Sequence, residues 1–293
     1  MAVSLHLGAH KTASTHLQYA LRLARDELRA GGVFLAEPSM LREETAQIPL
    51  SDALAMGEGC AAQAECRRLL AEMRGDAPDL LLTEENILGG TRRGTMFSRK
   101  GLLYPFAARR LRQAIDIAGG GPVTLFLALR DPAAFLVSAF ALQVSLGNEL
   151  ELAAYLQDRD PTRVGWSGLI RRLAEVEGVA RIVVWRYEDY AVLRPRLLAA
   201  MLPRGLGAHV PDPPRSNESL TQPGYDWMRR RAIADTEADL RHLARRARAR
   251  FRRAEGHAPL QLLSPQDHAR SARVYAAEIA RLRRLPGVEF LEP

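Results

Sequence analysis

The residues best suited to chemistry are concentrated in one short segment near the N-terminus. Gly8, Lys11, Thr12, Ser14 and Thr15 lie between a short apolar run and a helical pattern. A turn from a strand into a helix directs free backbone N–H groups and the positive end of the helix dipole at one point. The glycine permits a tight turn, the lysine adds a full positive charge, and the three hydroxyl groups add hydrogen-bond donors. The segment therefore predicts a binding site for a phosphate or sulfate group.

Two further features of this segment narrow its chemistry. Lysine is rare in the chain, because only Lys11 and Lys100 among the 41 basic residues are lysine. The loop that binds nucleoside triphosphates usually reads G-x-x-x-x-G-K-[ST]. Here Lys11 follows Gly8 after only two intervening residues, and no glycine directly precedes the lysine. The match to an ATP-binding loop is therefore poor.

A second candidate for anion binding follows the most clearly apolar segment of the chain, residues 123–129. Arg130 comes directly after this predicted strand, and Asp131 followed by Pro132 is typical of a helix start. A guanidinium group matches two phosphate oxygens at once, and open α/β sheets bind ligands at the carboxyl ends of their strands. Ser138, in the following helix, would add a hydroxyl donor. The alternative for Arg130 is an ion pair with Asp131 or another nearby acid.

Both segments resemble the nucleotide-binding motifs of the sulfotransferases that use 3′-phosphoadenosine 5′-phosphosulfate (PAPS), in their bacterial form. Residues 8–18 (GAHKTASTHLQ) are similar to the 5′-phosphosulfate loop G-x-x-K-T-[GA]-[ST]-T-x-[LI]-Q. Residues 130–138 (RDPAAFLVS) are similar to the 3′-phosphate segment R-[ND]-P-x-x-x-x-x-S. The resemblance covers residues 3–220 and implies a sulfotransferase that uses PAPS, releases adenosine 3′,5′-bisphosphate (PAP) and needs no metal.

The resemblance also implies roles for individual residues. Lys11 would contact the bridging oxygen and the 5′-phosphate, whereas Arg130 and Ser138 would bind the 3′-phosphate. Tyr187, in a strand-end Y-E-D that matches more weakly, would lie near the nucleotide. Residues 217–220 (NESL) resemble a late segment of bacterial members, to which we assign no role. The remaining residues of the loop would hold the phosphosulfate: Gly8, Thr12, Ala13, Ser14 and Thr15.

The acceptor hydroxyl needs a general base, and two carboxylates follow the strand predicted at residues 79–83. Many relatives place a glutamate at this strand end, and the resemblance aligns it with Glu85, with Glu84 as the alternate. His10, next to Lys11 in the loop, is a third candidate. His6 lies inside an apolar strand, and we expect it to be a core histidine.

Other functions remain open at this point. A P-loop kinase or NTPase would use an acid of residues 79–84 to bind magnesium, and a non-catalytic protein on the same fold would bind an anion without turnover. The sequence does not identify the acceptor, which would be a carbohydrate, a lipid or a small metabolite, possibly anionic or a glycan. It makes no prediction of the oligomeric state.

Alternating strand and helix signals predict the elements that position these residues. Apolar strands are expected at residues 3–7, 33–35, 79–83, 123–129 and 180–187, with helical patterns between them. Such alternation predicts an α/β fold of the P-loop type, with a parallel sheet flanked by helices. We expect a sulfotransferase-like domain over residues 1–224. A helical C-terminal segment over residues 225–293 should pack on it, with one long basic helix at 229–253 and another helix near 265–284.

Composition excludes several other classes. Hydrophobic residues make up 47% and charged residues 26% of the 293 residues, which is typical of a folded globular chain. Aromatic residues make up only 6%, which argues against a base-stacking nucleic-acid surface. No apolar run reaches the ~20 residues of a membrane span, and no signal peptide is evident, so we expect a cytoplasmic protein. Cys60 and Cys66 alone cannot form a disulfide framework or a metal cluster.

Arginine is concentrated in residues 229–253, which hold ten arginines and three acidic residues. The net charge of this segment, +7, equals that of the whole chain. It is either the solvated face of a helix or a surface that attracts an anionic substrate, polymer or membrane.

Overall fold

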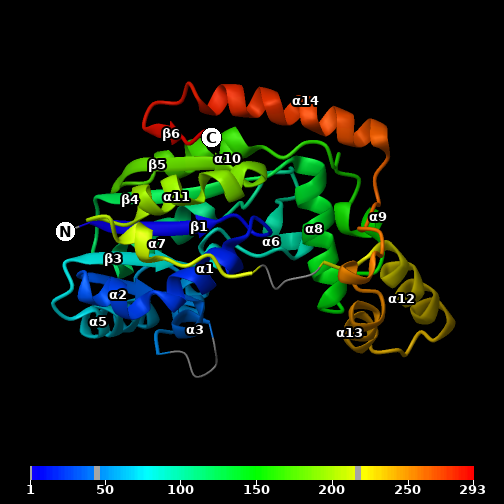
Figure 1. The fold of residues 1–293 in the computed structure, drawn as a ribbon, viewed down its shortest axis with the longest axis horizontal. Coiled ribbons are helices and arrows are strands. Elements are labelled where there is room, and N and C mark those ends of the chain that lie inside the picture. The colour runs from blue at the N-terminus through cyan, green and yellow to red at the C-terminus, as the bar shows by residue number, and fades with distance from the viewer. Residues whose placement is uncertain (1, 43–46, 215–218) are drawn as a thin grey trace.

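Parallel strands form the centre of the molecule (Figure 1). The structure is a computed structural model that describes residues 2–42, 47–214 and 219–293. Within these ranges, six strands make one parallel sheet in the order β2-β3-β1-β4-β5-β6. Their bounds are β1 Val3–Gly8, β2 Val33–Ala36, β3 Asp79–Thr83, β4 Val123–Leu129, β5 Val179–Arg186 and β6 Val288–Phe290. The predicted α/β class with a parallel sheet flanked by helices is confirmed.

The strands in the middle of the sheet are largely apolar because both faces are covered. In β4, Leu125 and Leu127 pack into a core on one face, whereas Phe126 and Ala128 pack into a second core on the other face. Successive side chains of a strand point to opposite faces. A continuous apolar run is therefore what a strand with two covered faces requires.

Helices cover both faces of the sheet. The helices α1, α2 and α11 pack on the face that carries Phe126, and α5, α7, α8 and α10 pack on the face that carries Leu125. The α-helices span α1 Ser14–Leu23, α2 Arg25–Ala30, α3 Pro38–Leu41, α4 Leu50–Met56, α5 Ala61–Arg74, α6 Arg93–Met96, α7 Ala107–Ile117, α8 Pro132–Ser145, α9 Leu152–Leu156, α10 Trp166–Ala174, α11 Tyr190–Met201, α12 Gln222–Ala234, α13 Leu240–Arg250 and α14 Pro265–Leu282.

The strand order brings the ends of three strands together. β1 lies between β3 and β4, with His6 opposite Thr83 on one side and Gly8 opposite Leu127 on the other. Because the strands are parallel, their carboxyl ends meet at the same edge of the sheet. The segments that follow β1, β3 and β4 are the three in which the sequence analysis places site residues.

The single basic helix expected at residues 229–253 is wrong, because the segment forms two helices, α12 and α13, separated by residues 235–239. Asp235 accepts a hydrogen bond from the backbone N–H of Glu237. Asp239 accepts hydrogen bonds from the backbone N–H groups of Arg241 and His242 and so caps α13. A short acidic side chain that accepts a hydrogen bond from a nearby backbone N–H favours a turn or a helix cap over continuation of the helix. The helical pattern after the first strand also divides, into α1 and α2 at Ala24.

The C-terminal segment packs on the rest of the chain. The long helix α14 lies against α8 and α10, and β6 pairs with β5 at the edge of the sheet (Figure 1). The sequence analysis does not predict β6, which has three half-buried residues. No helix in the described ranges has the length and apolar character needed to cross a membrane.

Candidate active site

The loop between β1 and α1 closes tightly on the end of its own strand. Gly8 has φ of 72°, in the left-handed region that favours glycine. A Cβ atom at this position would lie 2.5 Å from Oγ of Ser14 and 3.2 Å from Cβ of Glu85. Glycine therefore allows the start of α1 and the turn after β3 to approach the end of β1.

Two further residues of the loop adopt left-handed backbone conformations. Lys11 has φ of 63° and Ala13 has φ of 68°, although neither is glycine. Such conformations cost about 1–2 kcal/mol for residues with a Cβ, and they are concentrated where a loop serves a function. Ala13 is also the N-cap of α1, so no side chain caps this helix. The free N–H groups of the first turn are therefore available to an anion.

The hydroxyl groups of the loop divide into two kinds. Thr12 donates from Oγ1 to the carbonyl of Ala9 at 2.6 Å, and Ser14 donates from Oγ to the same carbonyl at 3.3 Å. These two hydroxyls hold the loop closed. Thr15 is exposed in the first turn of α1, where its hydroxyl faces solvent.

Arg130 joins this loop to the segment that follows β4. Its Nη1 atom donates to the backbone carbonyl of Lys11 at 2.7 Å, and its guanidinium group stacks on the ring of Tyr187 at 4.5 Å. Burial lowers the pKa of Arg130, but a guanidinium group stays protonated in proteins. Its buried Nε atom has no hydrogen-bond partner among the described residues. A buried donor without a partner marks a place where a ligand can bind.

Side chains of α14 and of the turn after β5 support the backbone next to Arg130. Asp131 caps α8 by accepting from the N–H of Ala134 at 3.1 Å, and it also accepts from the hydroxyl of the fully buried Ser271 at 2.8 Å. Glu188 accepts from the N–H of Asp131 at 2.9 Å and from the hydroxyl of Tyr275 at 3.2 Å. The C-terminal helix therefore fixes the turn that carries Arg130.

Lys11 lies in a strongly positive environment. Burial lowers its pKa, the charges of Arg130 and Arg248 lower it further, and the nearby carboxylate of Glu85 opposes them. Two basic side chains, Lys11 and Arg130, thus lie next to each other in a partly desolvated place. An anion bound between them would relieve their repulsion.

The two glutamates after β3 have different surroundings. Glu84 is buried and makes a bidentate ion pair with Arg42, with both N···O distances at 2.6 Å. Burial raises the pKa of Glu84 despite this partner. Glu85 accepts from the amide of Gln18 at 2.8 Å and pairs with Nη2 of Arg42 at 2.7 Å. Burial acts to raise the pKa of Glu85, but Arg42 and the Gln18 hydrogen bond help to outweigh it, so that this pKa is lowered.

Glu85 is thus the glutamate that lies against the loop, since its Cβ is the atom closest to Gly8 after the Ser14 hydroxyl. It is ionised at neutral pH, because its pKa lies below the ordinary carboxyl value. Glu84 is committed to Arg42 and to the N–H of Asn86. Sequence reasoning did not single out Arg42, because its link to both glutamates is a contact made only in the folded chain.

His10 has both ring nitrogens occupied. Nδ1 lies 2.9 Å from the hydroxyl of Tyr104 and Nε2 lies 3.1 Å from Oδ1 of Asn86. Burial lowers its pKa. With either tautomer, no ring nitrogen is free to take a proton from an acceptor in this conformation. His6 is a core histidine as expected, 2.8 Å from the hydroxyl of Thr83 and stacked on Trp185.

One expected contributor, Ser138, is not brought into this group by a recorded contact. Ser138 is half-buried on α8, and its hydroxyl makes no hydrogen bond within the described ranges. In the segment 217–220, residues 217 and 218 lie outside the described residues, and the buried Leu220 packs in the core. Within the described chain, no group of three His, Cys, Asp or Glu residues is placed to hold a metal ion.

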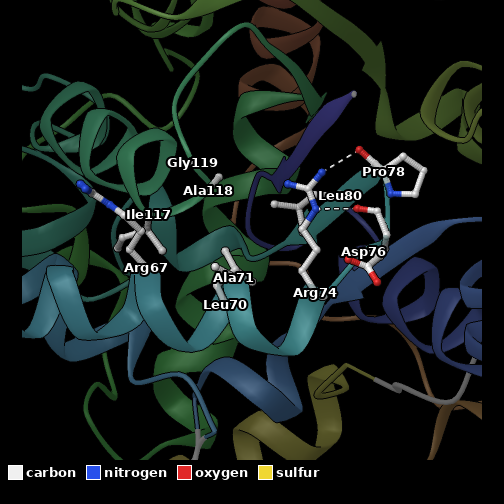
Figure 2. Close-up of a pocket in the computed structure, with 12 residues that line it drawn as sticks. Arg67, Leu70, Ala71, Arg74, Asp76, Pro78, Leu80, Ile117, Ala118 and Gly119 are labelled. Carbon is white, nitrogen blue, oxygen red and sulfur yellow. Dashed lines mark hydrogen bonds between the residues drawn. The ribbon is translucent and has the colours of Figure 1, made fainter.

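Two cavities lie at the opposite edge of the sheet. One of about 390 Å³ lies beside Leu80 at the start of β3 and the end of α7, and Arg74 hydrogen-bonds backbone carbonyls at its rim (Figure 2). Another, of about 600 Å³, is lined by Pro122 and Gly178 at the starts of β4 and β5. Neither is lined by residues of the loop after β1 or by Arg130. Since parallel sheets bind ligands at the carboxyl ends of their strands, we assign the site to that edge.

Comparison with known proteins gives a similarity in structure but no match in sequence. No protein-family model matches the chain, and no curated protein matches it in sequence. A solved structure of a sulfotransferase from Alicyclobacillus acidocaldarius is similar to it, with 15% sequence identity and a TM-score of 0.44. The similarity covers 84% of this chain and 96% of that one. At this low level of similarity, the chemistry of this chain follows only from its own residues.

Proposed function

We propose that the chain is a PAPS-dependent sulfotransferase, which transfers a sulfuryl group to a hydroxyl of an acceptor and releases PAP. The observation that carries the proposal is the contact of Arg130 with the Lys11 carbonyl. It joins the two segments that resemble the 5′-phosphosulfate loop and the 3′-phosphate segment. The uncapped start of α1 and the unpartnered Nε of Arg130 fit two anionic groups at one sheet edge.

The residues that would hold the nucleotide follow from this arrangement. Lys11, the first-turn N–H groups of α1 and the Thr15 hydroxyl would bind the 5′-phosphosulfate. Arg130 and Ser138 would bind the 3′-phosphate, and Tyr187 would hold the guanidinium group in place by stacking. The hydroxyls of Thr12 and Ser14 would act indirectly, by keeping the loop closed. PAPS supplies the activated sulfuryl group.

Sulfuryl transfer requires positioning and charge stabilisation rather than covalent work by the protein. The acceptor oxygen forms a bond to sulfur as the bond from sulfur to the phosphate oxygen of the leaving PAP breaks. Lys11 stabilises the negative charge that develops on that leaving oxygen. Glu85 accepts the proton of the acceptor hydroxyl. Its lowered pKa keeps it in the base form, and the hydroxyl becomes acidic enough to release its proton as the new bond forms.

The geometry disfavours the kinase or NTPase alternative. Asp79 lies at the start of β3, where it accepts from the N–H of Ala2 and pairs with Arg204, at the edge opposite the loop. Glu84 is bound by Arg42. Neither acid is free to bind magnesium beside Lys11. A non-catalytic role explains the loop but gives no reason for Glu85 to lie against it.

We also propose that residues 1–224 and 225–293 act as one unit, the second segment being a helical extension of the first. The support is that α14 holds the turn at Asp131 through Ser271, and that β6 extends the same sheet.

Transfer of radiolabelled sulfuryl from PAPS to a panel of phenols, lipids, neutral glycans and acidic glycans tests the proposal. Lys11→Ala is expected to reduce turnover by ~10²–10³-fold, the usual effect of losing one donor to developing charge. Lys100→Ala is the matched control, because Lys100 is the other lysine and is exposed. A Lys11→Ala variant with activity within threefold of the wild type would remove this residue from the mechanism. PAP binding without transfer to any acceptor would favour the non-catalytic alternative.

A further inference from the structure

An uncompensated cluster of arginines covers one surface of the C-terminal segment. We call the seven arginines between residues 241 and 253 the arginine face; all are exposed, and no acidic residue occurs in this stretch. Of the three acids just before it, Asp235 and Asp239 accept hydrogen bonds from backbone N–H groups, and Glu237 is exposed. Like charges at this density repel one another, and a bound polyanion would offset that repulsion.

Ion pairing within the protein does not neutralise this surface. Arg229, near the middle of α12, pairs with Glu151. In the described part of the chain, none of the seven arginines of the arginine face pairs with an acid. Arg245 contacts the ring of His242, and Arg250 stacks on Phe251. The charge of the arginine face is therefore available to a partner.

The arginine face lies on the same side of the molecule as the candidate active site. α12 and α13 lie on the side toward which the carboxyl ends of the strands point (Figure 1). α13 packs against α8, the helix that begins directly after Arg130 and Asp131. The charge of Arg248 also contributes to the lowered pKa of Lys11, and such an effect acts only over a short range. A polymer bound to the arginine face would thus reach the loop.

The side chains around the arginine face indicate which class of polyanion it would bind. Leu243, Ala244 and Ala247 of α13 are buried in the core and Leu240 packs partly buried against it, so that Ala249 is the exposed apolar residue of this helix. The helix therefore presents no apolar stripe for insertion into a membrane. Trp227 is covered by Arg231 and Arg246, each about 6 Å from the ring, so it does not offer an open ring for base stacking. Neither a lipid surface nor a single-stranded nucleic acid fits as well as a flexible, hydroxyl-rich polyanion.

We propose that the arginine face binds an acidic polysaccharide, and that a hydroxyl of this polymer is the acceptor. This inference rests on the proposed function, because sulfuryl transfer is what requires a hydroxyl next to Lys11. Carboxylate or sulfate groups repeated along the polymer would pair with arginines of α13 and the following turn. The sugar ring beyond them would enter the site.

Binding of oligogalacturonate, measured calorimetrically without PAPS, tests the surface separately from the reaction. The variant carries Arg241→Ser, Arg245→Ser and Arg252→Ser, and the matched control carries Arg171→Ser, Arg273→Ser and Arg284→Ser, three exposed arginines of α10, α14 and the turn after α14. We expect the variant to bind oligogalacturonate about tenfold more weakly, with a smaller dependence on salt, and the control to bind as the wild type does. Dextran of equal length should not bind.

The outcomes separate the inference from the proposed function. Equal losses in variant and control, or tighter binding to anionic phosphatidylglycerol vesicles or single-stranded RNA than to oligogalacturonate, would overturn the inference. In sulfuryl transfer to oligogalacturonate, the variant should raise KM about tenfold with kcat and PAP affinity unchanged. An unchanged KM would overturn the acceptor assignment. Failure of PAP to bind the wild type would overturn the proposed function instead.

Discussion

Arg130 donates a hydrogen bond from Nη1 to the backbone carbonyl of Lys11, at 2.7 Å and across 119 positions of sequence. The contact turns the Lys11 carbonyl toward the arginine. It also brings the positive charges of the two side chains close enough for that of Arg130 to help lower the pKa of Lys11. Such an arrangement gains stability when an anion binds between the two cations.

Arg130→Ala is expected to weaken PAP binding by ~1.5–3 kcal/mol, the usual value of a hydrogen bond to a charged group. The same change should barely alter the affinity for adenosine 5′-phosphate, which lacks the 3′-phosphate. Arg181→Ala is the control, because Arg181 is exposed and pairs with Glu289 at the far edge of the sheet. Equal losses for the two nucleotides would show that Arg130 does not read the 3′-phosphate.

The two glutamates are expected to respond differently to the same substitution. Glu85→Gln should retain the fold and PAP affinity and reduce turnover by ~10²–10⁴-fold, the range for general catalysis. Glu84→Gln should chiefly lower stability, by about 1.5–3 kcal/mol, because Arg42 loses its bidentate hydrogen-bonded partner and keeps only the Glu85 carboxylate.

Turnover and thermal unfolding of both variants check this division. A dead Glu84→Gln enzyme beside an active Glu85→Gln enzyme would reverse the assignment. If both stay active, the base lies elsewhere, and His10 is the next residue to change.

Gly8→Ala is expected to weaken PAP binding at least about tenfold and to lower the melting temperature. The alanine would adopt a left-handed conformation that costs about 1 kcal/mol, and its Cβ would meet the Ser14 hydroxyl at 2.5 Å. Gly205→Ala is a matched control: Gly205 has nearly the same φ, 73°, but no atom lies within 4 Å of the added Cβ. Similar PAP affinities for the two variants would mean that the close approach at Gly8 does not shape the site.

His6 is expected to make stability depend on pH. Burial lowers its pKa from 6.5 to about 4, so between these values the unfolded chain binds a proton that the folded chain does not. Stability therefore rises with pH in this window, and about 3 kcal/mol is lost as the pH falls through it.

Denaturant unfolding at pH 4 to 7 measures this effect. His6→Gln should show a shallower dependence on pH than the wild type, whereas His268→Gln, an exposed control, should match the wild type. Equal slopes for His6→Gln and the wild type would contradict the assignment.

The fold was predictable where local pattern and burial agree. The run at residues 123–129 is apolar except at Thr124 because β4 is covered on both faces, and Asp131 with Pro132 begins α8 as the sequence indicates. β6 was not predicted, because a strand of only three half-buried residues is too short to show a recognisable alternation of apolar and polar residues. The break between α12 and α13 was missed because two short acidic side chains bond to backbone and override a continuous basic pattern.

The candidate site was predictable only in the parts that are local in sequence. The loop of residues 8–15 and the turn at Arg130 carry their signal in consecutive residues. The ion pairs of Arg42 with Glu84 and Glu85, and the contacts of His10 with Tyr104 and Asn86, join distant segments. No spacing rule connects such partners. They decide which glutamate lies against the loop and whether His10 has a free ring nitrogen.

Calorimetric titration with PAP in the presence of EDTA asks whether the two anion-binding segments hold one nucleotide. We expect PAP to bind with one equivalent per chain. Lys11→Ala and Arg130→Ala should each weaken binding by about tenfold or more, and Lys100→Ala should leave it unchanged. Absence of PAP binding in EDTA, together with binding of ATP that requires magnesium, would contradict the assignment of this site to sulfuryl transfer.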